Sequence, residues 1–101
     1  MQRCSVVFSP EAAGQLDSLY GYVAAAASPE VALRYTNAIV SYCESLSTFP
    51  ERGTRRDDIR PGLRVTNYKK RAMIAFHVDA KLVSIIGIYY GGQDFESDLT
   101  E

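Results

Sequence analysis

The chain has 101 residues, 47% of them hydrophobic, and a formal net charge of −1 at pH 7. A chain of this length builds one small core, so we treat residues 1–101 as one domain and exclude a larger architecture. Its apolar runs are shorter than the roughly 20 residues that cross a bilayer, so no membrane-spanning helix is expected. Cys4 and Cys43 lie far apart and no secretory signal precedes them, which predicts reduced thiols and a cytoplasmic location.

The charge is distributed unevenly along the chain. Residues 51–71 contain eight of the eleven Lys and Arg residues and three acids, which gives +5, whereas the other three cations and nine acids give −6. We therefore expect an anionic partner to meet the molecule at this central segment. The alternative interpretation is a solvated basic loop beside a strand.

Two helices are predicted in the N-terminal half. A β-prone run, Val6–Phe8, ends at Ser9-Pro10-Glu11, where a capping Ser, a Pro and an acid together start a helix. The same signal at Ser28-Pro29-Glu30 starts a second helix, which Pro50 stops. Each helix has one apolar face: Leu16, Leu19, Tyr20 and Val23 in the first, and Val31, Tyr35, Ala38, Ile39, Tyr42, Leu46 and Phe49 in the second.

Three strands, Leu63–Tyr68, Ala72–Val78 and Leu82–Tyr90, are predicted after a charged loop from Pro50 to Pro61. The last strand is apolar on both faces, which predicts a central strand, with Val83 and Ile85 opposite Ile86 and Ile88. After a turn at Gly91-Gly92, the acidic tail Gln93–Glu101 is expected to be weakly structured. The order β-α-α-β-β-β predicts an α+β fold, an antiparallel sheet with a two-helix hairpin packed on one face.

Four motifs along the chain resemble ParE toxins of the RelE/ParE superfamily. They are the strand end Phe8–Ala12, the helix end Phe49-Pro50, the loop Ile59–Arg64 and the strand end Tyr90–Glu96. Each motif is short, but their order and spacing cover nearly the whole chain. The family's H-G-x-R-D element is altered, since Tyr90 stands at the position of its histidine and Gln93 at that of its arginine.

The resemblance implies a RelE/ParE-like fold and a toxin of a type II toxin-antitoxin system that binds DNA gyrase, at its A subunit, and inhibits it. It also implies neutralisation by a ParD-like antitoxin in a hetero-oligomer, without catalysis, cofactor or direct nucleic-acid recognition. A first alternative is a RelE-like ribosome-dependent mRNA endonuclease. Such enzymes place an arginine and a Tyr or His-Tyr pair near the C-terminus, where this chain has Gln93 and Leu99. A second alternative is a non-toxic member that binds its antitoxin.

The candidate site residues are chosen for contact with an antitoxin or target, and no catalytic residue is assigned. Lys69-Lys70-Arg71 places three exposed cations at a hairpin tip, where they contact an acidic partner or simply discourage edge pairing. The other candidates for such contacts are Arg60, Leu63, Arg64, Val65, Tyr90 and Gln93. His77, the only histidine, has no Cys, Asp or Glu at ligand spacing, so we expect no metal site.

Overall fold

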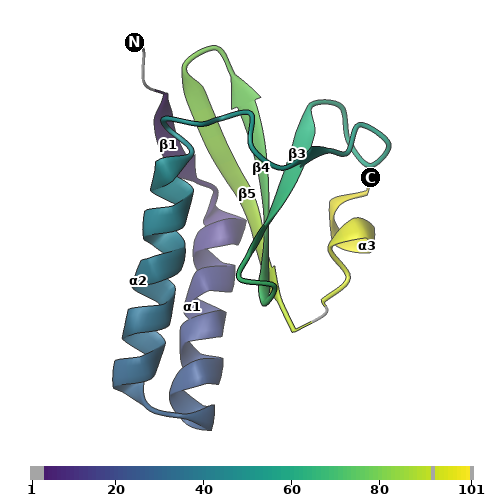
Figure 1. Ribbon diagram of the computed structural model, residues 1–101. Coiled ribbons are helices and arrows are strands. Elements are labelled where there is room, and N and C mark those ends of the chain that lie inside the picture. Colours follow the sequence, from purple (N-terminus) through teal and green to yellow (C-terminus); the bar gives the residue numbers. More distant parts are fainter. Residues whose placement is uncertain (1–3, 92, 101) are drawn as a thin grey trace.

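The computed structural model describes residues 4–91 and 93–100, which form a sheet with a helix pair on one side and a short helix on the other (Figure 1). Gly92 and Glu101, part of the predicted turn and tail, lie outside the described residues. The elements are β1 (Ser5–Phe8), α1 (Pro10–Ala26), α2 (Pro29–Ser45), β2 (Thr54–Arg55), β3 (Leu63–Tyr68), β4 (Ala72–Asp79), β5 (Leu82–Tyr90) and α3 (Phe95–Leu99). The α+β class and the predicted order are confirmed, with β2 and α3 in addition.

Both predicted helix starts are confirmed. Ser9 Oγ accepts a hydrogen bond from the Ala12 amide at 3.0 Å, and Ser28 Oγ accepts one from the Val31 amide at 3.1 Å. Each serine thereby satisfies an amide that has no partner within its helix.

The end of the second helix differs from the prediction. α2 stops at Ser45, and the chain continues in tighter turns, in which the Leu46 and Ser47 amides donate to carbonyls three residues back. Phe49 therefore lies beyond the helix and is 60% exposed, rather than on its buried face. Val31, at the other end of the predicted face, is 38% exposed.

The sheet has the strand order β1-β5-β4-β3-β2. The hairpin-linked strands β3, β4 and β5 pair antiparallel, as predicted, whereas β1 pairs parallel to β5, so the sheet is mixed. Parallel pairing is possible because the two helices, rather than a tight turn, connect β1 to the rest of the sheet. β5 is an interior strand with neighbours on both sides, while β4 occupies the centre.

A β-bulge changes the direction of the side chains of β5. Ala75 pairs with Gly87 and Phe76 pairs with Ile85, so Ile86 has no partner on β4. Ile88 consequently packs in the core beneath the helices together with Ile85, while Ile86 faces the opposite side. The prediction that Ile86 and Ile88 share one face is wrong, because simple alternation does not account for the extra residue.

The second face of the sheet is covered by the loop after β2 and by α3. Leu63, Val65, Ala75 and Tyr89 form a second core there with Leu99, which is 4% exposed. The prediction of a weakly structured tail is thus wrong, because Leu99 is buried and Asp94 caps α3 through the Ser97 amide at 3.2 Å. Among the described residues, no helix is long and apolar enough to cross a membrane.

Candidate functional site

A pocket of about 400 Å³ opens between the helix pair and the sheet at the end of the molecule where α1 ends and α2 begins. The turn between β3 and β4 and the end of β5 lie at the same end (Figure 1). Three tyrosines, two cations, two apolar side chains and a glycine line the pocket: Tyr22, Tyr35, Tyr90, Lys70, Arg71, Leu19, Val23 and Gly91. We call it the tyrosine pocket.

The aromatic walls of the tyrosine pocket come from elements far apart in sequence. Leu19, Tyr22 and Val23 lie three and four residues apart, so α1 presents them on one side. The rings of Tyr22 and Tyr90 contact each other, with centroids 5.6 Å apart. Tyr35 from α2 lies 6.3 Å from the ring of Tyr68, which supports it from the sheet.

Burial raises the pKa of Tyr35, and the nearby positive charge of Arg71 opposes that rise. The raised pKa keeps the Tyr35 hydroxyl protonated at neutral pH. It can therefore donate or accept a hydrogen bond, but it is a poor general base.

The turn beside the pocket has an unfavourable backbone conformation. Lys69 and Lys70 have φ values of 51° and 62°, which are positive at both central positions as in a type I′ turn. Glycine and asparagine adopt this conformation more readily than lysine does. The predicted turn is confirmed, and all three of its cations are exposed.

The three cations of the turn differ in their contacts. The Lys69 ammonium lies 5.6 Å from the centroid of the Tyr68 ring. Lys70 and Arg71 form no ion pair or side-chain hydrogen bond within residues 4–91 and 93–100. Their charges are therefore available at the rim of the tyrosine pocket.

A smaller hollow of about 210 Å³ lies on the other side of the same cations, and Lys70, Arg71, Tyr90 and Gln93 are among its lining residues. The structure thus brings together four of the residues predicted from the sequence. The Gln93 side-chain carbonyl accepts a hydrogen bond from the Tyr90 amide at 3.0 Å, so the glutamine closes the turn after β5.

The remaining predicted residues lie apart from the pocket. Leu63 is 0% and Val65 is 7% exposed, so neither side chain offers a contact surface while α3 covers them. Arg60 donates to the Leu99 carbonyl at 2.9 Å and is partly buried. Arg64 donates to the Arg52 and Glu51 carbonyls at 3.2 and 2.6 Å. The structure gives both arginines a part in holding the loop and tail.

The loop between β2 and β3 neutralises much of its own charge. Arg56 pairs with Asp58 at 2.9 Å and with Glu96 of α3 at 2.6 Å, and Arg55 pairs with Asp57 at 3.2 Å. A hydrogen bond from the Gly62 amide, supported by the charge of Arg55, lowers the pKa of Asp57. The hydrogen bond and charge of Arg56 likewise lower the pKa of Asp58, so Asp57 and Asp58 remain ionised at neutral pH and balance the arginines beside them.

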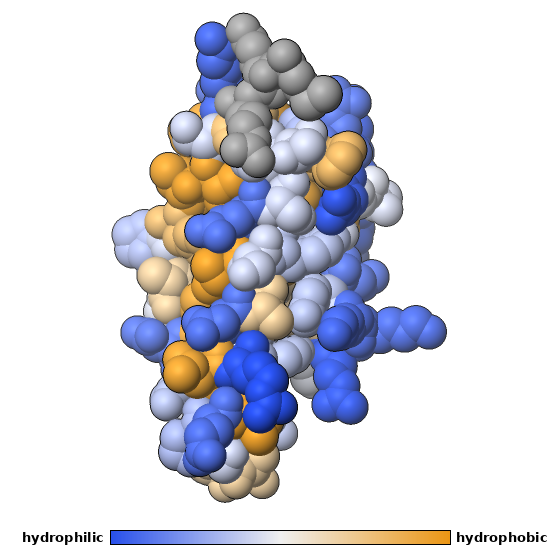
Figure 2. All heavy atoms as spheres, turned by 60° about the vertical axis from the view of Figure 1, so that its left-hand side comes forward, coloured by the Kyte–Doolittle hydropathy of each residue, from blue (hydrophilic) through white to orange (hydrophobic). Residues whose placement is uncertain are grey.

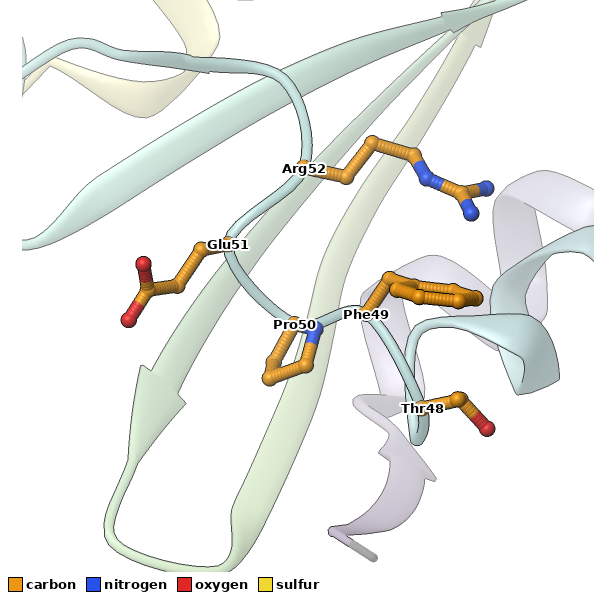
Figure 3. A pocket seen from close by; sticks show the side chains of 5 residues that line it. All are labelled: Thr48, Phe49, Pro50, Glu51 and Arg52. Atoms are coloured by element: carbon orange, nitrogen blue, oxygen red, sulfur yellow. The ribbon is translucent and has the colours of Figure 1, made fainter.

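A more open hollow of about 550 Å³ lies where α2 leads into the loop, and Figure 3 shows the five side chains that line it. The Arg52 guanidinium lies 5.4 Å from the ring centroids of both Phe49 and Tyr42. The Glu51 side chain points away from the Arg52 side chain (Figure 3). None of the predicted site residues lines this hollow. We therefore place the candidate site at the tyrosine pocket.

Sequence reasoning missed Tyr22 and Tyr35 as site residues. Tyr35 was assigned to the buried face of the second helix, and Tyr22 lies outside the predicted face of the first. The position of Tyr22 three residues after Leu19, and that of Tyr35 near the start of α2, are visible in the sequence. Their approach to Tyr90 and Arg71 depends on tertiary packing.

The His77 imidazole packs closely against Gly62. A Cβ added at this glycine would lie 2.5 Å from the His77 Nε2.

Comparisons with known proteins agree on the fold. The family model for the ParE toxin of the type II toxin-antitoxin system, parDE, matches residues 6–95. A chain of the chromosomal ParDE system from P. aeruginosa is 26% identical, with a TM-score of 0.76 over 87% of this chain and 96% of that chain. A chain of the toxin-antitoxin complex RelBE2 from Mycobacterium tuberculosis, 19% identical, has a TM-score of 0.64 over 88% of this chain and 99% of its own, which shows a common fold. No curated protein matches the sequence. Because the family model spans nearly the whole chain, the protein belongs to the family of ParE toxins of type II toxin-antitoxin systems.

Proposed function

We propose that this ParE-type toxin binds DNA gyrase, at its A subunit, and inhibits it by contact rather than by catalysis. The match of the ParE toxin model to residues 6–95 carries the proposal. The proposed target places this action in the cytoplasm. A ParD-like antitoxin would neutralise the toxin in a hetero-oligomer, which agrees with the toxin-antitoxin systems from which the two similar structures come.

The chemistry of the candidate site favours binding over RNA cleavage. Cleavage requires a group that takes the proton from the 2′-hydroxyl, in addition to cations that stabilise the phosphate. The site offers Lys70 and Arg71, but burial raises the pKa of Tyr35, so its hydroxyl is protonated at neutral pH and is not available to take up that proton. His77 lies further along β4, where it pairs with Leu63 and Ser84 rather than with the turn.

The helix hairpin offers exposed apolar surface for an amphipathic antitoxin segment. Leu33 and Val31 of α2 are 54% and 38% exposed. In Figure 2, which brings the helical side forward, apolar side chains form a broken band between polar ones. This surface supports the proposed complex, since stable partners cover apolar area that a lone toxin exposes.

The test is a supercoiling assay with purified gyrase and increasing concentrations of the toxin. We expect inhibition that saturates, and full recovery of supercoiling when an equimolar ParD-like antitoxin is added first. Unchanged supercoiling at a large excess of toxin would contradict gyrase inhibition. Primer extension on translated mRNA after induction of the toxin serves as the nuclease arm, and new cuts there would support the RelE-like alternative.

A further inference from the structure

We propose that the tyrosine pocket and the adjoining cations form the contact surface for the toxin's target, and that they hold an acidic segment which inserts one apolar or aromatic side chain. This inference rests on the proposed function, because it takes the target to be a protein. It adds the position of the contact and the chemistry of the segment that fits it.

The interior of the tyrosine pocket suits one large apolar side chain. Leu19 is 2% exposed and forms an apolar floor with Val23, while the paired rings of Tyr22 and Tyr90 form a wall. At about 400 Å³ the pocket lies at the small end of the range for binding pockets. Tyrosines favour such an insertion, since their rings pack on apolar groups while their hydroxyls remain hydrated.

The rim of the tyrosine pocket suits carboxylates that flank the inserted side chain. Lys70 and Arg71 line the pocket and have no ion-pair partner among the described residues. Outside residues 51–71 the chain carries a net charge of −6, so the rest of its surface is acidic on balance and would repel a long polyanion such as DNA. A short acidic segment satisfies the two cations without reaching that surface.

The conformation of the turn is consistent with a binding role. Lys69 and Lys70 both hold positive φ values, where an Asn-Gly pair would be more favourable. Unfavourable backbone conformations concentrate at binding and catalytic sites, where they fix the direction of functional side chains. Here the turn holds the Lys70 charge at the pocket before any partner arrives.

The size of this surface favours the target over the antitoxin as its occupant. A stable complex buries about 1,200–2,000 Å² in total, far more than one small pocket with two cations supplies. Exposed apolar side chains that could build such an area lie elsewhere: Val7, Val31, Leu33 and Leu82. A small pocket with two cations instead suits binding of a target that electrostatic attraction guides toward it.

Two substitutions and two matched controls test the proposal with the full chain. Lys70→Asn removes one rim charge and keeps a residue that tolerates positive φ, and Tyr22→Ala removes an exposed ring from the wall. Lys81→Asn removes an exposed cation at the other hairpin turn, and Phe49→Ala removes a ring that is 60% exposed outside the pocket.

The concentration of toxin that half-inhibits gyrase should rise at least tenfold in each pocket variant and change less than twofold in each control. The affinity for the antitoxin, measured by calorimetry, should change less than twofold in all four variants, which also shows that they fold. Unchanged inhibition by both pocket variants would overturn the proposal. Loss of antitoxin affinity with inhibition retained would also overturn it.

Growth arrest after induction of each variant separates this proposal from the identity of the target. If the wild-type toxin arrests growth without inhibiting gyrase, the gyrase assignment fails. The tyrosine pocket is then still supported if Lys70→Asn and Tyr22→Ala relieve the arrest while the controls do not. Arrest by all variants alike would overturn the pocket as the contact for any target.

Discussion

Two groups of cations, the arginines between residues 52 and 64 and the cations at 69–71, are both positively charged but make different contacts. Arg56 and Arg64 bind acids and backbone carbonyls of the loop and α3, whereas Lys70 and Arg71 have no ion-pair partner among the described residues. We call the first region the anchored region and the second the open turn. The comparison shows that a positive charge of this segment is available to a partner only where no acid or carbonyl of the chain already binds it.

The largest effect is expected at α3, to which the anchored region is bound and where Leu99 closes the second core. Leu99→Ala removes a side chain that is 4% exposed, so the free energy of unfolding should fall by about 2–4 kcal/mol. Urea denaturation followed by circular dichroism measures this. Leu33→Ala is the control, because Leu33 is 54% exposed and its loss should change stability by about 0.5 kcal/mol or less. Equal effects would mean that α3 does not stabilise the fold.

The next prediction compares the loss of stability on replacing one arginine from each region. Arg64→Ala removes hydrogen bonds to the Arg52 and Glu51 carbonyls, so stability should fall by about 1–2 kcal/mol. Arg71→Ala should change it by about 0.5 kcal/mol or less, since the exposed Arg71 side chain forms no such bond within the described part of the chain. Thermal and urea unfolding of both variants give the comparison. Similar losses in the two would erase the distinction between the regions.

A gain in stability is expected from the open turn. The double substitution Lys69→Asn and Lys70→Gly puts residues that tolerate positive φ at both positions. It should therefore reduce backbone strain and raise the free energy of unfolding by about 1 kcal/mol. The same variant should inhibit the target less, because both charges are lost. Ala80→Gly, at a φ of 49° in the other hairpin turn, is the control that should gain stability without losing inhibition. A stabilised variant with full activity would show that the lysines have no binding role.

The last effect concerns alkaline pH and Tyr89, which packs with Leu99 in the second core. Burial, with a hydrogen bond to Asp98 at 2.5 Å, raises the pKa of Tyr89 to about 12 from an ordinary value of 10.0. Because the folded pKa is the higher one, the contribution of Tyr89 to stability is complete below pH 10 and is lost between pH 10 and 12.

Urea midpoints measured from pH 8 to 12 test this expectation. Tyr89→Phe should be less stable at pH 8, where the hydrogen bond to Asp98 is missing, and should then lose less stability as the pH rises. The Cys43 thiol, whose pKa burial raises to about 12, titrates in both proteins and cancels in the difference. Parallel pH profiles for the two proteins would contradict the assignment.

Local signals in the sequence were sufficient for most of the fold. The capping serines at positions 9 and 28 and the strand alternation act within a few residues, so they can be read without tertiary structure. The parallel pairing of β1, the bulge in β5 and the burial of Leu99 depend on contacts between distant segments. Those features were therefore missed or predicted wrongly.

The candidate site was predictable only in part for the same reason. The turn at Lys69–Arg71 and the end of β5 were identified because charge runs and strand ends are local features. Tyr22 and Tyr35 reach the pocket only when the helix pair packs on the sheet. Similarly, nothing local distinguishes Arg64, which binds two backbone carbonyls, from Arg71, which binds none among the residues that the structure describes.

The bulge at Ile86 determines which of two adjacent tyrosines enters the pocket. Because one residue is looped out before Gly87, Tyr90 emerges on the side of the helices and Tyr89 turns toward Asp98. If β5 instead alternated regularly through Ile86, with no bulge, every later side chain would face the opposite side and the two rings would exchange sides. The bulge in this one strand thus decides which tyrosine forms a wall of the pocket and which one binds α3 through its hydroxyl.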